Sequence, residues 1–476
     1  MSGITQHRLL IGGEWRDGAS TIEVRNSFAG AHVGTIAAGT PGDMSDAIAA
    51  AVASLAADFP AHARYSVLQR AADLIDADAD AYAGDLASEG HKAIREARRE
   101  PPRSAEILRL AAEEGRRIAG ETLPFDIRPG SENRSGYYIR VPVGVVGAIL
   151  PFNDPLAVFA HKVGPAIAAG NAVVVKPDSR SPLAVFRMAR HLLDAGLPPG
   201  RLSVVSGDGA SVGAALVADP RVRLISFTGG VRTGERITAA AGIKKLVLEL
   251  GANSAVIVLD DADLDRAAGA VVDGAFAQAG QNCLGVQRVL AHESIFDGVL
   301  RRIVDRSLKL KTGSSMDEST DVCPLITQAA AERVEAMIWD AEKRGARVVA
   351  GGRRRGAVLE PTVLVDVPAG ARLDCDEAYG PVVAVYSVGS LDEGIARAND
   401  VEFGLQAAIF TNRLDSALRA SRQLQVGAVI VNDSTDYRLD TMPFGGVKRS
   451  GFGREGVRFA IDAMTETRVV CFNLEG

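Results

Sequence analysis

The run VVGAIL (145–150) begins the part of the sequence that decides the fold, because it is the first of five short, almost continuously apolar segments. The other four are NAVVVKP (171–177), RLSVVSG (201–207), VRLISFTG (222–229) and KKLVLELG (244–251). Helix-length segments such as LAVFAHKVGPAIAAG (156–170) and PLAVFRMARHLLDAG (182–196) alternate with them. Short buried strands that alternate with helices predict an α/β fold with a doubly wound, Rossmann-like parallel sheet. Nucleotides bind at the carboxyl edge of such sheets.

The flanking segments predict further helices and strands. Before these strands, three alanine-rich stretches (45–59, 65–87 and 101–120) have the apolar spacing of helices, and residues 135–150 have an extended pattern. After them, we expect helices at 262–280, 294–310 and 329–345 and strands at 288–293, 381–388, 405–411 and 427–432. A second α/β unit therefore follows the first. The last strand, TRVVCFNL (467–474), has nothing after it to cover its edge, so we expect it to pair with another sheet or chain.

Length and composition favour a large soluble enzyme. The 476 residues are enough for two or three domains. The net charge of −6 and the lack of a basic run argue against nucleic-acid binding. The longest apolar stretch, 141–152, is too short for a membrane span of roughly 20 residues, and the first residues lack a signal-peptide pattern. The four cysteines lie far apart without a CxxC pair, so we expect no metal site, no disulfide framework and a cytoplasmic location.

Three residues stand where chemistry is expected. Cys283 lies in AGQNCLGVQRV, where backbone amides and polar groups would stabilise a thiolate; the alternative is a small buried hydrophobe. Glu249 ends a buried strand, where partial burial would raise its pKa toward that of a general base; the alternative is a solvated strand end. Asn153 lies in the turn PFNDP, where its amide could donate to an oxyanion or simply stabilise the turn.

Two further positions suit a nucleotide. FTGGVRTG (227–234) is a glycine-rich turn from strand to helix, and its bare backbone allows a pyrophosphate to approach a helix N-terminus. Lys176 ends the second apolar run, where it could reach a ribose hydroxyl or a phosphate, or cap the surface.

The ordered motifs PFNDP, KPDS, FTGG, LELG, GQNC, EAYGP and PFGGVKRSG resemble the aldehyde dehydrogenase superfamily along nearly the whole chain. The resemblance implies an NAD(P)-binding domain (1–123 and 142–250), a catalytic domain (251–456) and an oligomerisation segment (124–141 and 457–476). It implies a homodimer or homotetramer that acts on a small aldehyde. Among its branches, the run 432–455 and the triplet AHK (160–162) look most like those acting on lactaldehyde, glyceraldehyde and phosphonoacetaldehyde.

The resemblance also assigns the catalytic roles. Cys283 matches the nucleophile and Glu249 the general base, while Asn153 and the backbone N–H of Cys283 match the oxyanion hole. Lys162 and Glu455 match a pair often assigned to proton relay. Because relatives that transfer the acyl group to coenzyme A tend to lack the base, the resemblance implies hydrolysis of the thioester by water.

The residues implied to bind NAD or NADP come from both α/β units. They are Lys176, Ser179, Phe227, Thr228, Gly229, Gly230, Gly234, Leu250, Glu377 and Tyr379. Relatives that prefer NAD often have a glutamate at the position of Ser179, and a glutamate there repels a 2′-phosphate. Asp178 is expected to point elsewhere. We therefore expect NADP to be tolerated, with the preference left open.

Polar residues replace the usual aromatic ones at three substrate positions: Asp154, His161 and Arg438. Together with Arg288 and Tyr437, they predict a short polar aldehyde, and an anionic head group such as a phosphonate is favoured. The alternative is that Arg438 pairs with Asp154 or Asp440 and contacts no substrate. A rival function is oxidation of a carboxylate-bearing semialdehyde such as succinate semialdehyde. A further alternative is that the protein is a binding or structural member of the superfamily that has lost its activity.

Overall fold

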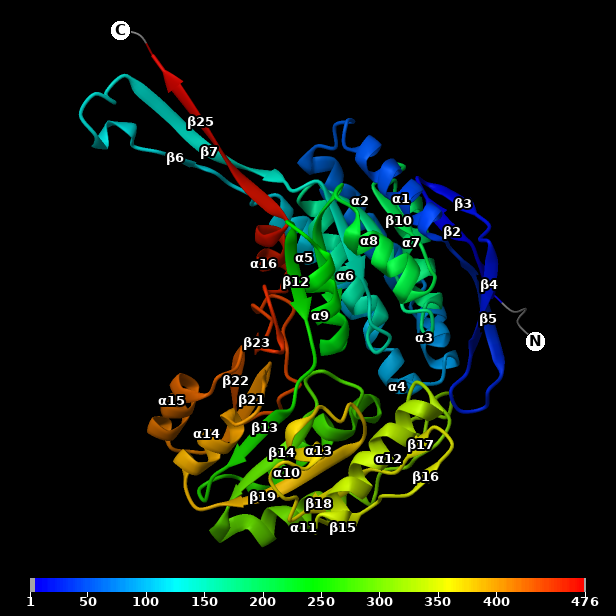
Figure 1. Ribbon diagram of the computed structural model, residues 1–476, viewed down its shortest axis with the longest axis vertical. Helices are drawn as coiled ribbons and strands as arrows, with labels where there is room; N and C mark the ends of the chain where they lie inside the picture. Colours follow the sequence, from blue (N-terminus) through cyan, green and yellow to red (C-terminus); the bar gives the residue numbers. More distant parts are fainter. Residues whose placement is uncertain (1–4, 475–476) are drawn as a thin grey trace.

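The structure, a computed structural model, describes residues 5–474 and contains two large sheets with helices packed on them (Figure 1). The first sheet has eight strands in the order β24-β12-β11-β8-β9-β10-β2-β3. Their bounds are β2 (Leu9–Ile11), β3 (Glu14–Arg16), β8 (Val145–Ile149), β9 (Ala172–Lys176), β10 (Leu202–Val204), β11 (Val222–Thr228), β12 (Lys245–Glu249) and β24 (Gly451–Phe452). The five strands from β12 to β10 are parallel, and β24, β2 and β3 extend the edges in antiparallel pairing. The predicted parallel sheet of five apolar runs is confirmed.

Helices cover both faces of this sheet, because successive strand residues point to opposite sides. Val146 and Ala148 of β8 share a core with helices α2, α5, α6 and α7, whereas Val145 and Ile149 share a core with α1, α8 and α9. The helices of this unit are α1 (Pro41–Ser54), α2 (Ala61–Ala77), α3 (Ala79–Ser88), α4 (Ile94–Ala97), α5 (Glu100–Gly115), α6 (Pro155–Ala168), α7 (Leu183–Asp194), α8 (Ala214–Ala218) and α9 (Val231–Ala240). The alanine-rich helices predicted before residue 120 are confirmed.

The second sheet has seven strands in the order β15-β18-β19-β14-β13-β21-β22, all parallel except β15. Their bounds are β13 (Ser254–Val258), β14 (Val286–His292), β15 (Arg347–Ala350), β18 (Thr362–Val365), β19 (Val382–Val388), β21 (Gln406–Phe410) and β22 (Ala428–Val431). Its helices are α10 (Leu264–Phe276), α11 (Phe296–Ser307), α12 (Gln328–Lys343), α13 (Arg372–Cys375), α14 (Leu391–Asn399) and α15 (Leu414–Gln423). This is the second α/β unit that the sequence predicts.

A third sheet forms an arm that projects from the body (Figure 1). In it, β7 (Arg134–Pro142) lies between β6 (Glu121–Thr122) and the final strand β25 (Thr465–Asn473). The expected pairing of the last strand with another sheet is confirmed. Because β25 is an edge strand and most of its residues are exposed, the arm offers a free edge within residues 5–474.

The remaining strands form small sheets that the sequence patterns did not predict. A three-stranded sheet joins β1 (Thr5–His7), β5 (His32–Ala38) and β4 (Ser20–Arg25). Two-stranded pairs join β16 (Arg354–Arg355) to β17 (Val358–Leu359) and β20 (Phe403–Gly404) to β23 (Val447–Lys448). The strands of the two-stranded pairs have two residues each, which is too short to show a period in the sequence.

Two segments lie outside the units to which the predicted boundaries assign them. Strand β24 falls within the range 251–456 but pairs with β12 of the first sheet. Helix α16 (Val457–Ala463) falls within the range 457–476 but packs against α5 and α6. The chain thus returns to the first unit before it enters the arm, because Val457 and Ile461 are buried in the first core.

Candidate active site

A cleft of about 1470 Å³ is lined by residues from both α/β units. Four parallel strands of the first sheet reach it at their carboxyl ends: β8 leads to Asn153, β9 ends at Lys176, β11 at Thr228 and β12 at Glu249. Typical small-molecule pockets measure roughly 300–1,000 Å³. The cleft is therefore large enough for a dinucleotide and a small substrate side by side.

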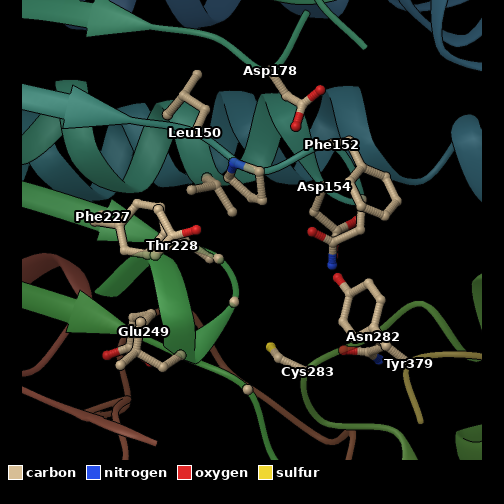
Figure 2. A pocket seen from close by; sticks show the side chains of 18 of the residues that line it. Leu150, Phe152, Asp154, Asp178, Phe227, Thr228, Glu249, Asn282, Cys283 and Tyr379 are labelled. Carbon is tan, nitrogen blue, oxygen red and sulfur yellow. The ribbon is translucent and has the colours of Figure 1, made fainter. Parts of the chain in front are cut away.

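Cys283 reaches the cleft from a turn that follows α10. Gln278 and Ala279 have left-handed φ values of 52° and 55°, and Gly280 has φ 69°. A Cβ at Gly280 would lie 2.1 Å from the carbonyl oxygen of Gly380, so only glycine fits. Figure 2 shows the sulfur directed into the space between Glu249 and Tyr379. The strained turn thus presents the sulfur to the cleft.

The Cys283 thiol has a raised pKa and so holds its proton strongly. Burial raises the pKa of Cys283 well above its ordinary value, and the nearby Glu249 carboxylate adds to the rise, while the Arg438 guanidinium opposes it. A thiol of this kind needs a base before it can act as a nucleophile.

Glu249 is the predicted candidate for that base. Its carboxylate is buried, and neither oxygen has a hydrogen-bond partner within residues 5–474. Burial raises the pKa of Glu249 well above its ordinary value, and the Glu455 carboxylate raises it further, against the lowering effect of Arg438 and Lys162. A raised pKa brings proton exchange by the carboxyl group closer to neutral pH, as general base catalysis requires.

Asn153 lies in the turn between β8 and α6 and lines the same cleft. The residue is buried, yet no group in the described part of the chain hydrogen-bonds its side-chain amide. The amide donors are therefore available to a negatively charged oxygen in the cleft.

Lys162 and Glu455 form the pair that the resemblance implies. The Nζ of Lys162 lies 2.9 Å from Glu455 Oε1 and 2.9 Å from Ser226 Oγ, and all three residues are buried. Although burial opposes ionisation, the Lys162 and Arg438 charges lower the pKa of Glu455 to about 2. Glu455 is therefore ionised, and its charge acts on the nearby Glu249.

The part of the cleft lined by the cofactor residues of the resemblance is here called the cofactor half. The lining includes Lys176, Phe227, Thr228, Gly229, Gly230, Leu250, Glu377 and Tyr379. Gly230 is the N-cap of α9, so the N-terminus of a ten-residue helix faces this half. Glu377 accepts a hydrogen bond of 2.8 Å from the backbone N–H of Ala252, and burial raises the pKa of Glu377 to about 7.

Three residues near this half differ from the prediction. Ser179 does not line the cleft, and its hydroxyl donates to the Gly207 carbonyl at 3.3 Å. Gly234 does not line it either; its Cα packs on Leu250, where a Cβ would lie 2.7 Å from a methyl group. Asp178, which we expected to point elsewhere, lines the cleft and is directed toward it in Figure 2. Its carboxylate forms an ion pair of 2.6 Å with Arg180, another lining residue.

Arg438 and His161 line the other half of the cleft. The Arg438 guanidinium stacks on Phe444, with its carbon 3.8 Å from the ring centre, and lies 3.4 Å from Glu455 Oε2. His161 Nε2 lies 2.9 Å from Asp440 and 3.2 Å from Arg438, and burial lowers the pKa of His161 to about 4, which leaves the ring neutral at pH 7. Arg438 is thus the cation of this group, beside the ionised Glu455 and the neutral His161.

The other three predicted substrate residues lie in different surroundings. Arg288 is buried in the second unit, where its guanidinium donates to Asn253 and to backbone carbonyls, and it does not line the cleft. Tyr437 also lies off the cleft and is 43% exposed. Asp154 lines the cleft, but its Oδ1 accepts from Lys92 at 2.6 Å and Gln278 at 2.8 Å.

Arg438 does not form the internal pairs that were the alternative to substrate binding. Asp154 is bonded to Lys92, and Asp440 to Arg103 at 2.7 Å. Within residues 5–474, the ion-pair partner of Arg438 is instead Glu455 at 3.4 Å, which is already paired with Lys162.

Sequence reasoning missed a buried charged group behind Asn153. Lys92 and Glu100 are both buried and lie 2.5 Å apart. The sequence offered one signal for this group, namely two charged residues in a segment that also supplies apolar core residues. Their other partners, Asp154 and the start of α6, are distant in the sequence and could not be inferred.

Comparison with known proteins gives a consistent result. The model of the aldehyde dehydrogenase family matches residues 15–470. The chain is 43% identical over 474 residues to 3-sulfolactaldehyde dehydrogenase of Priestia aryabhattai (100% of this chain, 99% of that protein), and 45% identical over 457 residues to aspartate-semialdehyde dehydrogenase 1 of Pseudomonas canavaninivorans (96% and 97%). It superimposes with a TM-score of 0.96 on NADP-dependent glyceraldehyde-3-phosphate dehydrogenase from Bacillus halodurans C-125 complexed with NADP, at 36% identity (99% and 100%). No helix within residues 5–474 is long and apolar enough to cross a membrane.

Proposed function

Because this chain belongs to the aldehyde dehydrogenase family, we propose that it oxidises a small anionic aldehyde to the carboxylate with NAD or NADP as hydride acceptor. The observation that supports the anionic substrate is the charge balance beside Cys283. Lys162 and Arg438 share the single carboxylate of Glu455, and His161 is neutral at pH 7. Lys162 lies closer to Glu455 (2.9 Å) than Arg438 does (3.4 Å), and the buried Nε of Arg438 has no hydrogen-bond partner within residues 5–474, so Arg438 keeps a charged donor for an anionic head group.

The lining of the other half of the cleft fits a dinucleotide. The α9 N-terminus favours a phosphate, and Gly230 leaves open space where a side chain would otherwise stand. The Thr228 hydroxyl is buried without a protein partner within residues 5–474, and Glu377 offers a carboxylate to ribose hydroxyls. Gly229, Lys176 and Tyr379 complete the proposed cofactor contacts.

The catalytic side chains carry out the covalent steps. Glu249 takes the thiol proton, and the Cys283 sulfur adds to the aldehyde carbon. The Asn153 amide and the Cys283 backbone N–H stabilise the oxyanion of this thiohemiacetal. When bound, the nicotinamide ring supplies a hydride acceptor, so a thioester remains on Cys283. After Glu249 has released the first proton to solvent, its carboxylate removes a proton from water, which attacks the thioester; the Cys283 sulfur leaves as the thiolate, and the carboxylate product is released.

The named relatives support a charged substrate without fixing which one. Sulfolactaldehyde, the substrate named for the Priestia protein, carries a sulfonate, and aspartate semialdehyde carries a carboxylate. We favour a short aldehyde with a sulfonate, phosphonate or carboxylate group. The second candidate is a longer semialdehyde such as succinate semialdehyde, favoured by a mitochondrial succinate-semialdehyde dehydrogenase of Arabidopsis thaliana at 37% identity.

We further propose that the arm mediates assembly into a homodimer or homotetramer. Strand β25 leaves unpaired backbone groups along one edge, and Val469 and Phe472 are exposed on it. A second chain would cover this edge. Sedimentation analysis would test the assembly, and a monomer at micromolar concentration would contradict it.

A panel of small aldehydes tests the proposed function. The purified protein is assayed with NAD and with NADP against aldehydes that carry sulfonate, phosphonate, carboxylate or hydroxyl groups, and against propanal. We expect the highest kcat/KM with a short anionic aldehyde. Equal kcat/KM for propanal would contradict the anionic substrate, and no cofactor reduction with any aldehyde would contradict the enzymatic function.

A further inference from the structure

The turn that carries Asn153 is fixed on both sides of that residue. On one side, His91 Nε2 donates to the carbonyl of Phe152 at 2.9 Å. On the other side, Lys92 Nζ donates to Asp154 Oδ1 at 2.6 Å. Since no protein group hydrogen-bonds the Asn153 amide within residues 5–474, these two neighbours determine where the amide lies.

The start of α6 is held by the same group. Glu100 Oε2 accepts from Lys92 at 2.5 Å, and its Oε1 accepts from the backbone N–H groups of Leu156 and Ala157 at 2.8 and 3.1 Å. These donors have no partner within a helix, so the carboxylate caps α6 from another part of the chain. Lys92 thus links the cap of α6 to the residue beside Asn153.

Gln278 extends this group to the nucleophile turn. Its Nε2 donates to Asp154 Oδ1 at 2.8 Å, and its backbone N–H donates to Glu96 Oε1 at 3.0 Å. Gln278 is in the left-handed conformation and lies five residues before Cys283. The unfavourable φ persists only where neighbouring contacts determine it. Two hydrogen bonds therefore tie the strained turn of the second unit to the first unit.

We propose that Lys92, Glu100, Asp154 and Gln278, here called the clamp, are positioning residues that set the geometry between the Asn153 amide and the Cys283 sulfur. The proposal rests on the proposed function. It gives Asp154 a role other than substrate binding, since its Oδ1 joins Lys92 to Gln278. Oxyanion stabilisation depends on donor position, and a misplacement of about 1 Å costs roughly 100-fold in rate.

The test compares Lys92→Met, Gln278→Met and the double variant with the wild type. Arg98→Met is the matched control, because Arg98 lies on the same segment but is exposed, and among the described residues its ion pair is with Glu318 alone. For each variant, kcat and KM are measured with the best aldehyde of the panel. The rate of Cys283 alkylation by iodoacetamide is followed by mass spectrometry, and Tm reports folding.

We expect each clamp variant to lower kcat by roughly 100-fold while KM changes by less than about threefold. Because the clamp acts as one unit, the double variant should fall no more than about threefold below the worse single variant. In Lys92→Met, alkylation of Cys283 should stay within about twofold of the wild type, because the thiol itself is not removed. Arg98→Met should match the wild type.

A purely structural role predicts a different pattern. In that case Tm falls, but kcat per folded site stays close to that of the wild type, and such a result would overturn the proposal. If Lys92→Met does not fold, Gln278→Met decides, since it removes one hydrogen bond and leaves no charge unpaired; unchanged kcat there overturns the clamp. Failure of the proposed function can be distinguished from failure of the clamp proposal, because in the first case the wild type itself would oxidise no aldehyde.

Discussion

Replacement of Arg438 by methionine tests how the substrate is recognised. The Arg438 side chain is 11% exposed and stacks on Phe444, so an anion that binds it is largely desolvated. A hydrogen bond to a charged group is worth about 1.5–3 kcal/mol, which corresponds to roughly 10- to 150-fold in kcat/KM. We therefore expect Arg438→Met to lower kcat/KM for phosphonoacetaldehyde or 3-sulfolactaldehyde by that factor, chiefly through KM.

The neutral substrate propanal separates recognition from chemistry. Arg438 lowers the pKa values of Cys283 and Glu249, so its loss slows the reaction of every aldehyde to a similar extent. The informative quantity is thus the ratio of kcat/KM for the anionic aldehyde to that for propanal, measured by absorbance of the reduced cofactor. Arg449→Met controls for the general loss of positive charge at the cleft, because Arg449 lines it but pairs with Glu402 and Glu235. An unchanged ratio in Arg438→Met would refute the anion site.

Three other predictions follow from the site. Cys283→Ala should lower kcat by roughly 1,000-fold or more. The covalent acyl adduct that we expect to detect by mass spectrometry in the wild type should be absent from this variant. Retained activity would show that Cys283 is not the nucleophile. Because Glu249 both deprotonates Cys283 and activates water in the proposed mechanism, Glu249→Gln should lower kcat by roughly 100- to 10,000-fold without a burst of cofactor reduction. Since the wild-type base works only when deprotonated, the wild-type rate should fall as pH drops through the raised pKa of Glu249, and this acid limb should be absent from Glu249→Gln; an identical profile contradicts the assignment. Gly251→Ala places a Cβ 2.2 Å from Glu377 Oε2, so the Kd of NAD or NADP measured by fluorescence should rise roughly tenfold or more. Iodoacetamide labelling of Cys283 without cofactor should be unaffected, and an unchanged Kd would show that Glu377 does not bind the ribose.

The convergence of the candidate catalytic residues on one cleft was predictable because it depends on strand ends. Asn153 and Glu249 each follow a buried parallel strand, and the carboxyl ends of such strands meet at one edge. Cys283 could be named from its local context and from the resemblance. The structure brings all three to one cleft.

The directions of the side chains around these residues were less predictable, because the direction of a side chain depends on contacts with residues that can be distant in the sequence. Arg288 lies five residues after Cys283, yet the pleat of β14 directs it into the second unit toward Asn253. Asp178 was expected to point away from the cleft, but its pairing with Arg180 holds it at the lining.

The sequence by itself determined the main helices and strands, the parallel sheets and the candidate reacting groups, because these depend on periodicity and on short motifs. Only the tertiary structure decided that Arg438 shares Glu455 with Lys162, and that Lys92 links Asp154 to Glu100. These groups are separated by up to 293 residues in the chain. Their charges and pKa values arise from burial and from distances that exist only once the two units have packed together.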